Sequence, residues 1–322
     1  MAVYTKLEKE EINNILLNYK LGKLKNFEGI KEGIENTNYS IQTEKGKYIL
    51  TIYERRVKKT DLPFFSNLMV ELSKNNFISP KPIPNKDNNY ISDFNDKKFM
   101  IVSFLDGKSK NNLSPSECKI VGNQIAKLHQ ITKNFKFSRK NDLSIGSWRS
   151  IFAQVKDKCN KIHPELPNLI EANLSSIERK WPKNLPSGII HADLFSDNIF
   201  FKNNKFSGFI DFYFSCNDFY AFEIAICFNA LCFEGVKQNL SFNVTKAKKL
   251  MEGYNEVRKI SKDEKIAIKV LSQGAALRFL LTRVFDYINT VDNAVVKIKD
   301  PEEYLKRLEF HKNAKSFEDY LI

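Results

Sequence analysis

Four polar residues between positions 188 and 216 have the types and spacing needed for phosphoryl transfer. His191, Asp193 and Asn198 share one polar loop behind a short apolar run, and Asp211 follows two more apolar runs joined by a KNNK turn. A loop aspartate can accept the proton of an attacking hydroxyl, while an amide and a second carboxylate hold the magnesium ion that bridges the ATP phosphates. We therefore expect Asp193 to be the catalytic base, and Asn198 and Asp211 to be metal ligands. We expect His191 to fix the loop rather than to carry protons.

This constellation is specific, because four defined positions recur at tight spacing between apolar runs. A chance loop with an acid and an amide would not also place an Ile-Asp pair after two apolar runs. The expected cofactors are ATP and Mg²⁺, a hard cation that prefers oxygen ligands. The alternative is a non-catalytic protein that binds a nucleotide with the same loop.

The residues upstream of this stretch predict a nucleotide-binding lobe. Residues 27–54 change to a period of two and predict three strands, and residues 90–105 predict two more. The loop between the first two strands holds two glycines and two asparagines, so its backbone amides can approach phosphates without obstruction. The expected nucleotide contacts in this loop are Gly29, Gly33, Asn36 and Asn38.

One cation that this chemistry normally uses is missing from its usual place. Kinases present a lysine to the ATP phosphates from the third strand, but the corresponding stretch here offers Thr51. Lys47, Arg55, Arg56 and Lys58 lie close by in sequence. The sequence leaves open which of them substitutes.

The composition changes at Asp106-Gly107, where an apolar strand gives way to a polar segment. We place the hinge between two lobes there, which predicts a nucleotide-binding lobe at 1–106 and a catalytic and substrate-binding lobe at 107–322. In two-lobed kinases the main chain of this segment reads the adenine edge. The expected adenine contacts are Ser103, Phe104 and Leu105.

Helical periodicity predominates in the second part of the chain. Ser114 and Glu117 have the spacing of a capping box at the start of the first of these helices. Glu223 and Asn229 lie within an almost wholly apolar run and need buried partners. The fold class is therefore α+β, with helices expected at 6–20 and 61–76, the latter capped by Asp61, and at 114–130, 147–160, 164–180, 221–233, 263–287 and 301–311.

Composition narrows the class of protein. The formal net charge is +13, but the positive residues are mostly scattered lysines that accompany many Asn, Ile and Phe, which favours a coding bias over a nucleic-acid partner. The five cysteines form no CxxC pair and are expected to be reduced and buried. No window approaches the length of a membrane span. We expect a cytoplasmic protein without a nucleic-acid or membrane partner, either a monomer or a homodimer.

The chain resembles the aminoglycoside phosphotransferase and choline kinase superfamily of small-molecule kinases. His-Ala-Asp at 191–193 replaces the His-Arg-Asp of protein kinases, and no Ala-Pro-Glu or activation loop follows. Within that superfamily, the chain resembles the bacterial homoserine kinases more closely. This resemblance rests on segments along the whole chain, among them GIKEGIENTNY (29–39), IIHADLFSDNIFF (189–201), GFIDFYFSCND (208–218), ALRFLLTR (276–283) and KDPEEYLKRLEFH (299–311).

The resemblance implies a two-lobed protein-kinase-like fold, with an N-terminal antiparallel sheet lobe and a larger helical lobe. It also implies transfer of the ATP γ-phosphate to the hydroxyl of L-homoserine, which gives O-phosphohomoserine for threonine synthesis. Such a substrate needs an anion for its ammonium group, from Asp218, Glu223 or Asn229, and a cation for its carboxylate, from Arg278 or Arg283. A buried pair of Glu223 and Arg278 that joins two helices would explain those two equally well. Choline, an aminoglycoside or another small alcohol is the alternative substrate.

Overall fold

The N-terminal part of the protein is an antiparallel sheet. The computed structural model describes residues 4–30, 36–54, 57–236, 239–289 and 300–322. The strand order is β1-β2-β3-β5-β4, and the strands predicted for 27–54 and 90–105 are confirmed. Their bounds are β1 (Leu24–Gly29), β2 (Thr37–Thr43), β3 (Gly46–Tyr53), β4 (Ile91–Phe94) and β5 (Lys97–Ser103).

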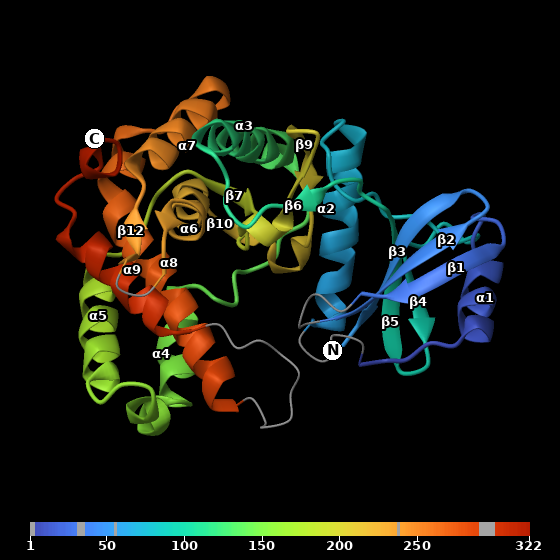
Figure 1. Cartoon of the computed structure of the whole chain (residues 1–322), viewed down its shortest axis with the longest axis horizontal. Coiled ribbons are helices and arrows are strands. Elements are labelled where there is room, and N and C mark those ends of the chain that lie inside the picture. Colours follow the sequence, from blue (N-terminus) through green and yellow to red (C-terminus); the bar gives the residue numbers. More distant parts are fainter. Residues whose placement is uncertain (1–3, 31–35, 55–56, 237–238, 290–299) are drawn as a thin grey trace.

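The two faces of this sheet bury into different cores. Successive side chains of a strand point to opposite faces, and along β5 Phe99 and Ile101 pack with α1 (Lys9–Leu17), whereas Met100 and Val102 join the main core. Helix α2 (Leu62–Lys74) stands between the sheet and the helical part of the molecule (Figure 1), and its buried side chains belong to that main core. The sheet is thereby packed against the helical part through α2.

The C-terminal part is mainly helical. Ser114 and Glu117 form the predicted capping box, in which each side chain accepts a hydrogen bond from the other's backbone N–H. The helices are α3 (Pro115–Ile131), α4 (Ile145–Ala153), α5 (Leu166–Lys180), α6 (Tyr220–Leu231), α7 (Val244–Val257), α8 (Lys262–Asn289) and α9 (Glu302–Asn313). Short strands complete it: β6 (Lys108–Ser109) with β8 (Ile199–Lys202) and β9 (Lys205–Phe209), β7 (Ser187–Ile190) with β10 (Cys216–Phe219), and β11 (Phe233–Glu234) with β12 (Ser241–Phe242).

Two details of the helices differ from expectation. Helix α7 was not predicted, although Ala247, Leu250, Met251 and Tyr254 are buried at helical spacing. Asp61 is the N-cap residue of α2, as predicted, but its backbone lies in a short 3₁₀ turn and its side chain makes no capping hydrogen bond. Its carboxylate instead binds the guanidinium group of Arg139, with Nε and Oδ2 2.6 Å apart.

The chain passes between the two parts at Gly107. This residue has φ +118°, and a Cβ there would lie 2.9 Å from the carbonyl oxygen of Phe201, so only glycine fits without strain. The next residues form β6, which pairs with β8 of the catalytic part. Both observations support the proposed division between residues 106 and 107.

Two expectations from composition concern the whole chain. All five cysteines are buried and free of disulfides, as predicted. Across the described ranges, every helix is too short or too polar to cross a membrane.

Candidate active site

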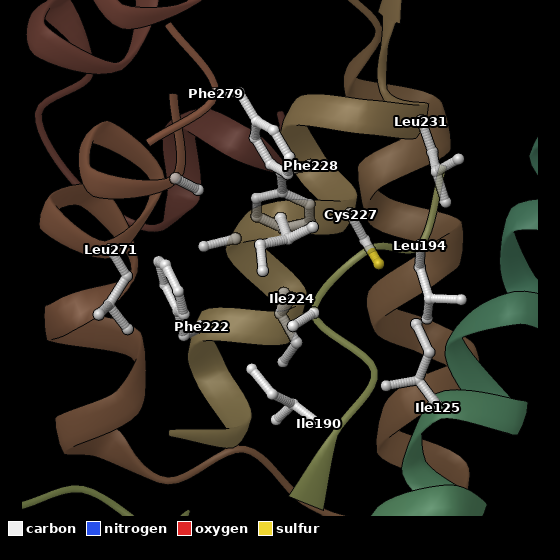
Figure 2. Close-up of a cluster of buried hydrophobic side chains, with 14 of the residues drawn as sticks. Ile125, Ile190, Leu194, Phe222, Ile224, Cys227, Phe228, Leu231, Leu271 and Phe279 are labelled. Carbon is white, nitrogen blue, oxygen red and sulfur yellow. The ribbon is translucent and has the colours of Figure 1, made fainter. Parts of the chain in front are cut away.

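The loop that carries Asp193 is anchored by apolar side chains on both sides. Ile190 at the end of β7 and Leu194 just after the aspartate are both fully buried. Figure 2 shows these two side chains in the same cluster as Ile224 and Cys227 of α6. Between them, Ala192 adopts φ +67°, a left-handed conformation that is uncommon for residues other than glycine. The backbone around Asp193 is therefore held in one specific shape.

Glu223 and Arg278 hold that shape through the peptide groups of the loop. The backbone N–H groups of His191 and Ala192 donate to the Glu223 carboxylate, and Arg278 Nη1 donates to the Ala192 carbonyl oxygen over 2.7 Å. Burial raises the pKa of Glu223 to about 7, while the two backbone donors and Arg278 oppose the shift. Both side chains are almost fully buried. The acid of α6 and the arginine of α8 thus meet at the backbone of the loop.

His191 connects the loop to the strand that precedes Asp211. Its Nε2 lies 2.9 Å from the carbonyl oxygen of Ile210. Burial lowers the pKa of His191 to about 4, so the imidazole is neutral near pH 7 and Nε2–H donates to that carbonyl. This geometry supports the interpretation that His191 fixes the loop.

Asn198 and Asp211 lie side by side behind the catalytic loop. The Asn198 side-chain amide donates to the Asp193 carbonyl oxygen over 2.8 Å and to its carboxylate over 3.2 Å. The backbone N–H of Ile210 donates to the Asn198 carbonyl oxygen over 3.0 Å, which brings the Asp211 backbone beside Asn198. Asp211 itself has φ +63°. Because the NH₂ group of Asn198 faces Asp193, its side-chain oxygen is left for another partner.

These donors fit a magnesium ion. Mg²⁺ commonly takes one or two protein oxygens and completes its shell with water and substrate phosphates. Asn198 and Asp211 supply two such oxygens. Within the described residues, no group of three or more His, Cys, Asp or Glu side chains is arranged to hold a metal, so an ion here would depend on phosphate oxygens for the rest of its shell.

A narrow cleft, with a volume of about 50 Å³, lies between the sheet lobe and this site. It is lined by Asn36 of the predicted phosphate loop, by Lys58 and by Asp211, among others. Asn36 accepts the backbone N–H of Glu54 over 3.3 Å. Of the cations near the third strand, Lys58 lines the same cleft as Asp211, and its Nζ lies 2.9 Å from Asp142 Oδ2. Arg55 and Arg56 lie outside the described residues.

Two of the other predicted phosphate contacts, Gly29 and Asn38, lie at the two ends of the loop between β1 and β2. Gly29 pairs with Tyr39 at the end of β1, and the Ile30 backbone N–H donates to the Asn38 carbonyl oxygen over 2.8 Å. The Asn38 side chain accepts the hydroxyl of Thr51 over 2.8 Å. Gly33 lies outside the described residues.

The hinge segment uses part of its main chain internally. The N–H of Ser103 donates to the Lys81 carbonyl oxygen over 2.8 Å, and that of Phe104 donates to the Lys47 carbonyl oxygen over 3.2 Å. Hydrogen bonds to an adenine would therefore have to come from the carbonyl groups of this segment and from the main chain of Leu105.

Two of the predicted substrate contacts are engaged elsewhere. Asn229 is fully buried: its side-chain amide donates to the Ala225 and Ser272 carbonyl oxygens and its oxygen lies 3.1 Å from His311 Nε2. Asp218 pairs with Gly188, at the far end of β7 from the catalytic loop, and accepts the Asn141 amide over 2.6 Å. These contacts make Asn229 a link between α6, α8 and α9, and Asp218 a tether for the segment around Asn141.

Arg283 lies with two residues that were not singled out as site residues, Tyr304 and Arg307. The guanidinium carbons of both arginines are 4.4 Å from the centroid of the fully buried Tyr304 ring. Burial raises the pKa of Tyr304, the two arginines oppose the shift, and the nearby Asp193 adds to it. A tyrosine and an arginine three positions apart share one face of a helix, and that spacing is the signal that could have found them.

Arg139 is a second residue that sequence reasoning missed. It lines the same cleft as Asp211, donates to the Ser215 carbonyl oxygen over 3.3 Å, and reaches across to Asp61 just before α2. Its guanidinium group also lies over the ring of Phe65, 5.2 Å from the centroid. The residue thus ties the two parts of the molecule together beside the site.

Comparison with known proteins identifies the family of this chain. A model of the phosphotransferase enzyme family matches residues 26–244. The homoserine kinase of Mesorhizobium japonicum is 43% identical over 320 residues, which cover 99% of each protein. That of Xanthobacter autotrophicus is 44% identical over 320 residues, again 99% of each. The chain belongs to the homoserine kinase group of the phosphotransferase enzyme family. The resemblance noted in the sequence is thereby confirmed.

Solved structures of small-molecule kinases share the fold of this phosphotransferase. An amicoumacin kinase in complex with AMP-PNP and Ca²⁺ superposes with a TM-score of 0.71 at 14% identity, over 97% of this chain and 95% of that one. A choline kinase from Cryptosporidium parvum has a TM-score of 0.65 at 19% identity, over 95% and 94% of the two chains. The two-lobed kinase-like fold is confirmed.

Proposed function

We propose that this phosphotransferase transfers the γ-phosphoryl group of ATP to the side-chain hydroxyl of L-homoserine. The observation that carries the proposal is the full-length similarity to homoserine kinases, at 43–44% identity over 99% of the chain. The product, O-phospho-L-homoserine, is the precursor used in threonine synthesis. We also propose a cytoplasmic location, where thiols such as the five buried ones here stay reduced.

In this proposal Asp193 orients the homoserine hydroxyl and accepts its proton. The hydrogen bond from Asn198 fixes the carboxylate, and Glu223 and Arg278 hold the peptide groups before it. Little covalent chemistry is required of the protein in phosphoryl transfer, so catalysis rests on positioning and on charge stabilisation. The backbone N–H groups of residues 191 and 192 and the carbonyl oxygen of Ala192 are all held by hydrogen bonds. The loop therefore meets the requirement for positioning.

The nucleotide would lie in the cleft between the lobes. Asn198 and Asp211 would hold Mg²⁺, which when bound neutralises charge on the phosphates. The loop at Asn36 and the side chain of Lys58 line the same cleft as Asp211, which supports phosphate binding by these residues. The carbonyl groups of 103–105 are the proposed adenine contacts.

A substrate panel tests this function. We expect the protein to phosphorylate L-homoserine with a turnover of about 1–100 per second. Choline and kanamycin should give kcat/KM values lower by at least about 10³-fold, since a site built to bind one set of polar groups rejects substrates that lack them. A coupled assay that follows ADP release measures all three. Turnover of choline or kanamycin without turnover of homoserine would replace the proposed substrate, and no turnover at all would favour a non-catalytic nucleotide-binding protein.

A further inference from the structure

Two arginines from different helices converge on one tyrosine near the catalytic aspartate. Arg283 of α8 and Arg307 of α9 each place the guanidinium carbon 4.4 Å from the Tyr304 ring centroid. Tyr304 is fully buried. Two like charges are therefore gathered on one aromatic ring, and the Glu303 carboxylate, 2.9 Å from Arg283 Nη1, compensates one of them.

Ring contacts connect this pair of arginines to the catalytic loop. Phe195, two residues after Asp193, contacts the ring of Phe279 with centroids 4.9 Å apart, and Phe279 contacts the ring of Tyr304 at 5.4 Å. The Tyr304 ring and the two guanidinium groups on it are thus connected, through packed aromatic rings, to the segment that follows Asp193.

The arginines of this region differ in the partners they already have. Arg278 donates to the Ala192 carbonyl oxygen over 2.7 Å. Arg283 binds the Glu303 carboxylate over 2.9 Å and the Asp300 carbonyl oxygen over 2.7 Å. Among the described residues, Arg307 has no carboxylate partner within salt-bridge distance, and its Nε is buried without a hydrogen-bond acceptor. The Nε of Arg278 is likewise buried without an acceptor, but the guanidinium group of Arg278 is held by the Ala192 carbonyl oxygen. A buried donor without an acceptor is costly. Among the described residues, neither a carboxylate nor a main-chain carbonyl holds Arg307, so its guanidinium group can take an anionic ligand.

We propose that Arg307 binds the α-carboxylate of the substrate and so restricts the enzyme to amino acids that carry a side-chain hydroxyl. A guanidinium group matches a carboxylate with two parallel hydrogen bonds, and stacking on Tyr304 fixes the plane of the fork. Arg283 is paired with Glu303 and packs on the same Tyr304 ring as Arg307. This assignment rests on the proposed function, because it concerns the recognition of homoserine at the same site.

A purely structural role for Arg307 makes a different prediction. The side chain also lies over the ring of Phe233, 5.4 Å from the centroid, so it can hold α9 against its neighbours without binding a ligand. Loss of packing alone would lower stability and would affect every acceptor alike. Carboxylate binding affects only acceptors that carry the carboxylate.

The experiment compares L-homoserine with 3-amino-1-propanol, which is homoserine without its carboxylate. Arg307→Met should raise the KM for homoserine by about 10²-fold or more, the size expected when one partner of a buried charge pair is removed. The affinity for 3-amino-1-propanol, measured as a KM or as an inhibition constant, and the KM for ATP should change by less than about threefold. Arg307→Lys keeps the positive charge but not the two parallel donors of the guanidinium group, and it should give an intermediate KM for homoserine. This variant keeps the test valid if the methionine variant does not fold.

Arg258→Met is the matched control. Arg258 likewise lies over tyrosine rings, 4.7 Å from the centroid of Tyr220, and pairs with a buried glutamate on α8. Its loss should lower the melting temperature and leave the KM for homoserine unchanged. The assignment of Arg307 is overturned by either of two results with a wild-type protein that phosphorylates homoserine. Both Arg307 variants could keep the wild-type KM for homoserine, or their affinities for homoserine and for 3-amino-1-propanol could fall by the same factor. If the wild-type protein does not use homoserine at all, the proposed function fails first.

Discussion

Asp193, the proposed catalytic base, lies in a loop whose peptide groups are held by two buried side chains. Asp193, Asn198 and Asp211 were predicted from spacing alone, because each follows an apolar run at a fixed distance. The contacts of Glu223 and Arg278 with the loop were not predicted. From the sequence, an acid and an arginine in apolar helices suggest either an ion pair with each other or contacts with a substrate. Their actual partners are the backbone N–H and carbonyl groups of residues 191–192. Spacing does not reveal contacts to main-chain atoms.

Glu223 should therefore control the rate through its charge. Glu223→Gln should lower kcat for homoserine by about 10- to 100-fold at pH 8, since hydrogen bonds to a charged group contribute roughly 1.5–3 kcal/mol. The pKa of Glu223 is raised to about 7, so the carboxylate is ionised above that pH and gains a proton below it. The wild-type kcat should accordingly fall between pH 8 and pH 6, and the fall should be weaker in the glutamine variant.

The control for this substitution is Glu264→Gln. Glu264 is equally buried on α8 but pairs with Arg258, away from the catalytic loop. This variant should lose stability and keep the wild-type pH profile of kcat. A Glu223→Gln enzyme with unchanged kcat and pH profile would contradict the role assigned to this carboxylate.

At the scale of elements, glycines set how closely two helices approach. A Cβ on Gly122 of α3 would lie 1.9 Å from the Leu250 carbonyl oxygen of α7, and one on Gly253 of α7 would lie 1.8 Å from the Lys119 carbonyl oxygen of α3. The two backbones are therefore in contact. Periodicity predicted most of the helices and strands. Helix α7 was not predicted, because lysines lie between its buried positions and weaken the apolar pattern.

Gly122→Ala should destabilise the protein although alanine is the better helix former. The added methyl group forces α3 and α7 apart, at a cost of about 1–3 kcal/mol or more. Gly146→Ala in α4 is the control, because a Cβ there meets nothing within 4 Å, and it should be neutral or stabilising by up to about 1 kcal/mol. Urea denaturation measures both. Equal stabilities of the two variants would disagree with the close approach of the helices.

At the scale of the whole molecule, the two-lobed architecture was predictable and the meeting of distant segments was not. The change of composition at Asp106-Gly107, with mainly strands predicted before it and helices after it, distinguished a sheet lobe from a helical lobe. The convergence of Arg283, Tyr304 and Arg307 near Asp193 depends on how α8 and α9 pack, which no local pattern encodes. The contact of Arg139 with Asp61 across the lobes has the same origin.

The most direct test of the central claim follows the product by ³¹P NMR. Wild-type protein incubated with MgATP and L-homoserine should yield ADP and one new phosphomonoester signal, that of O-phosphohomoserine. Asp193→Asn, which keeps the shape of the side chain, should bind ATP normally and form this product about 10²- to 10⁴-fold more slowly, the usual contribution of a general base. Formation of O-phosphohomoserine at the wild-type rate by the Asp193→Asn protein, or its absence with the wild-type protein, would contradict the account.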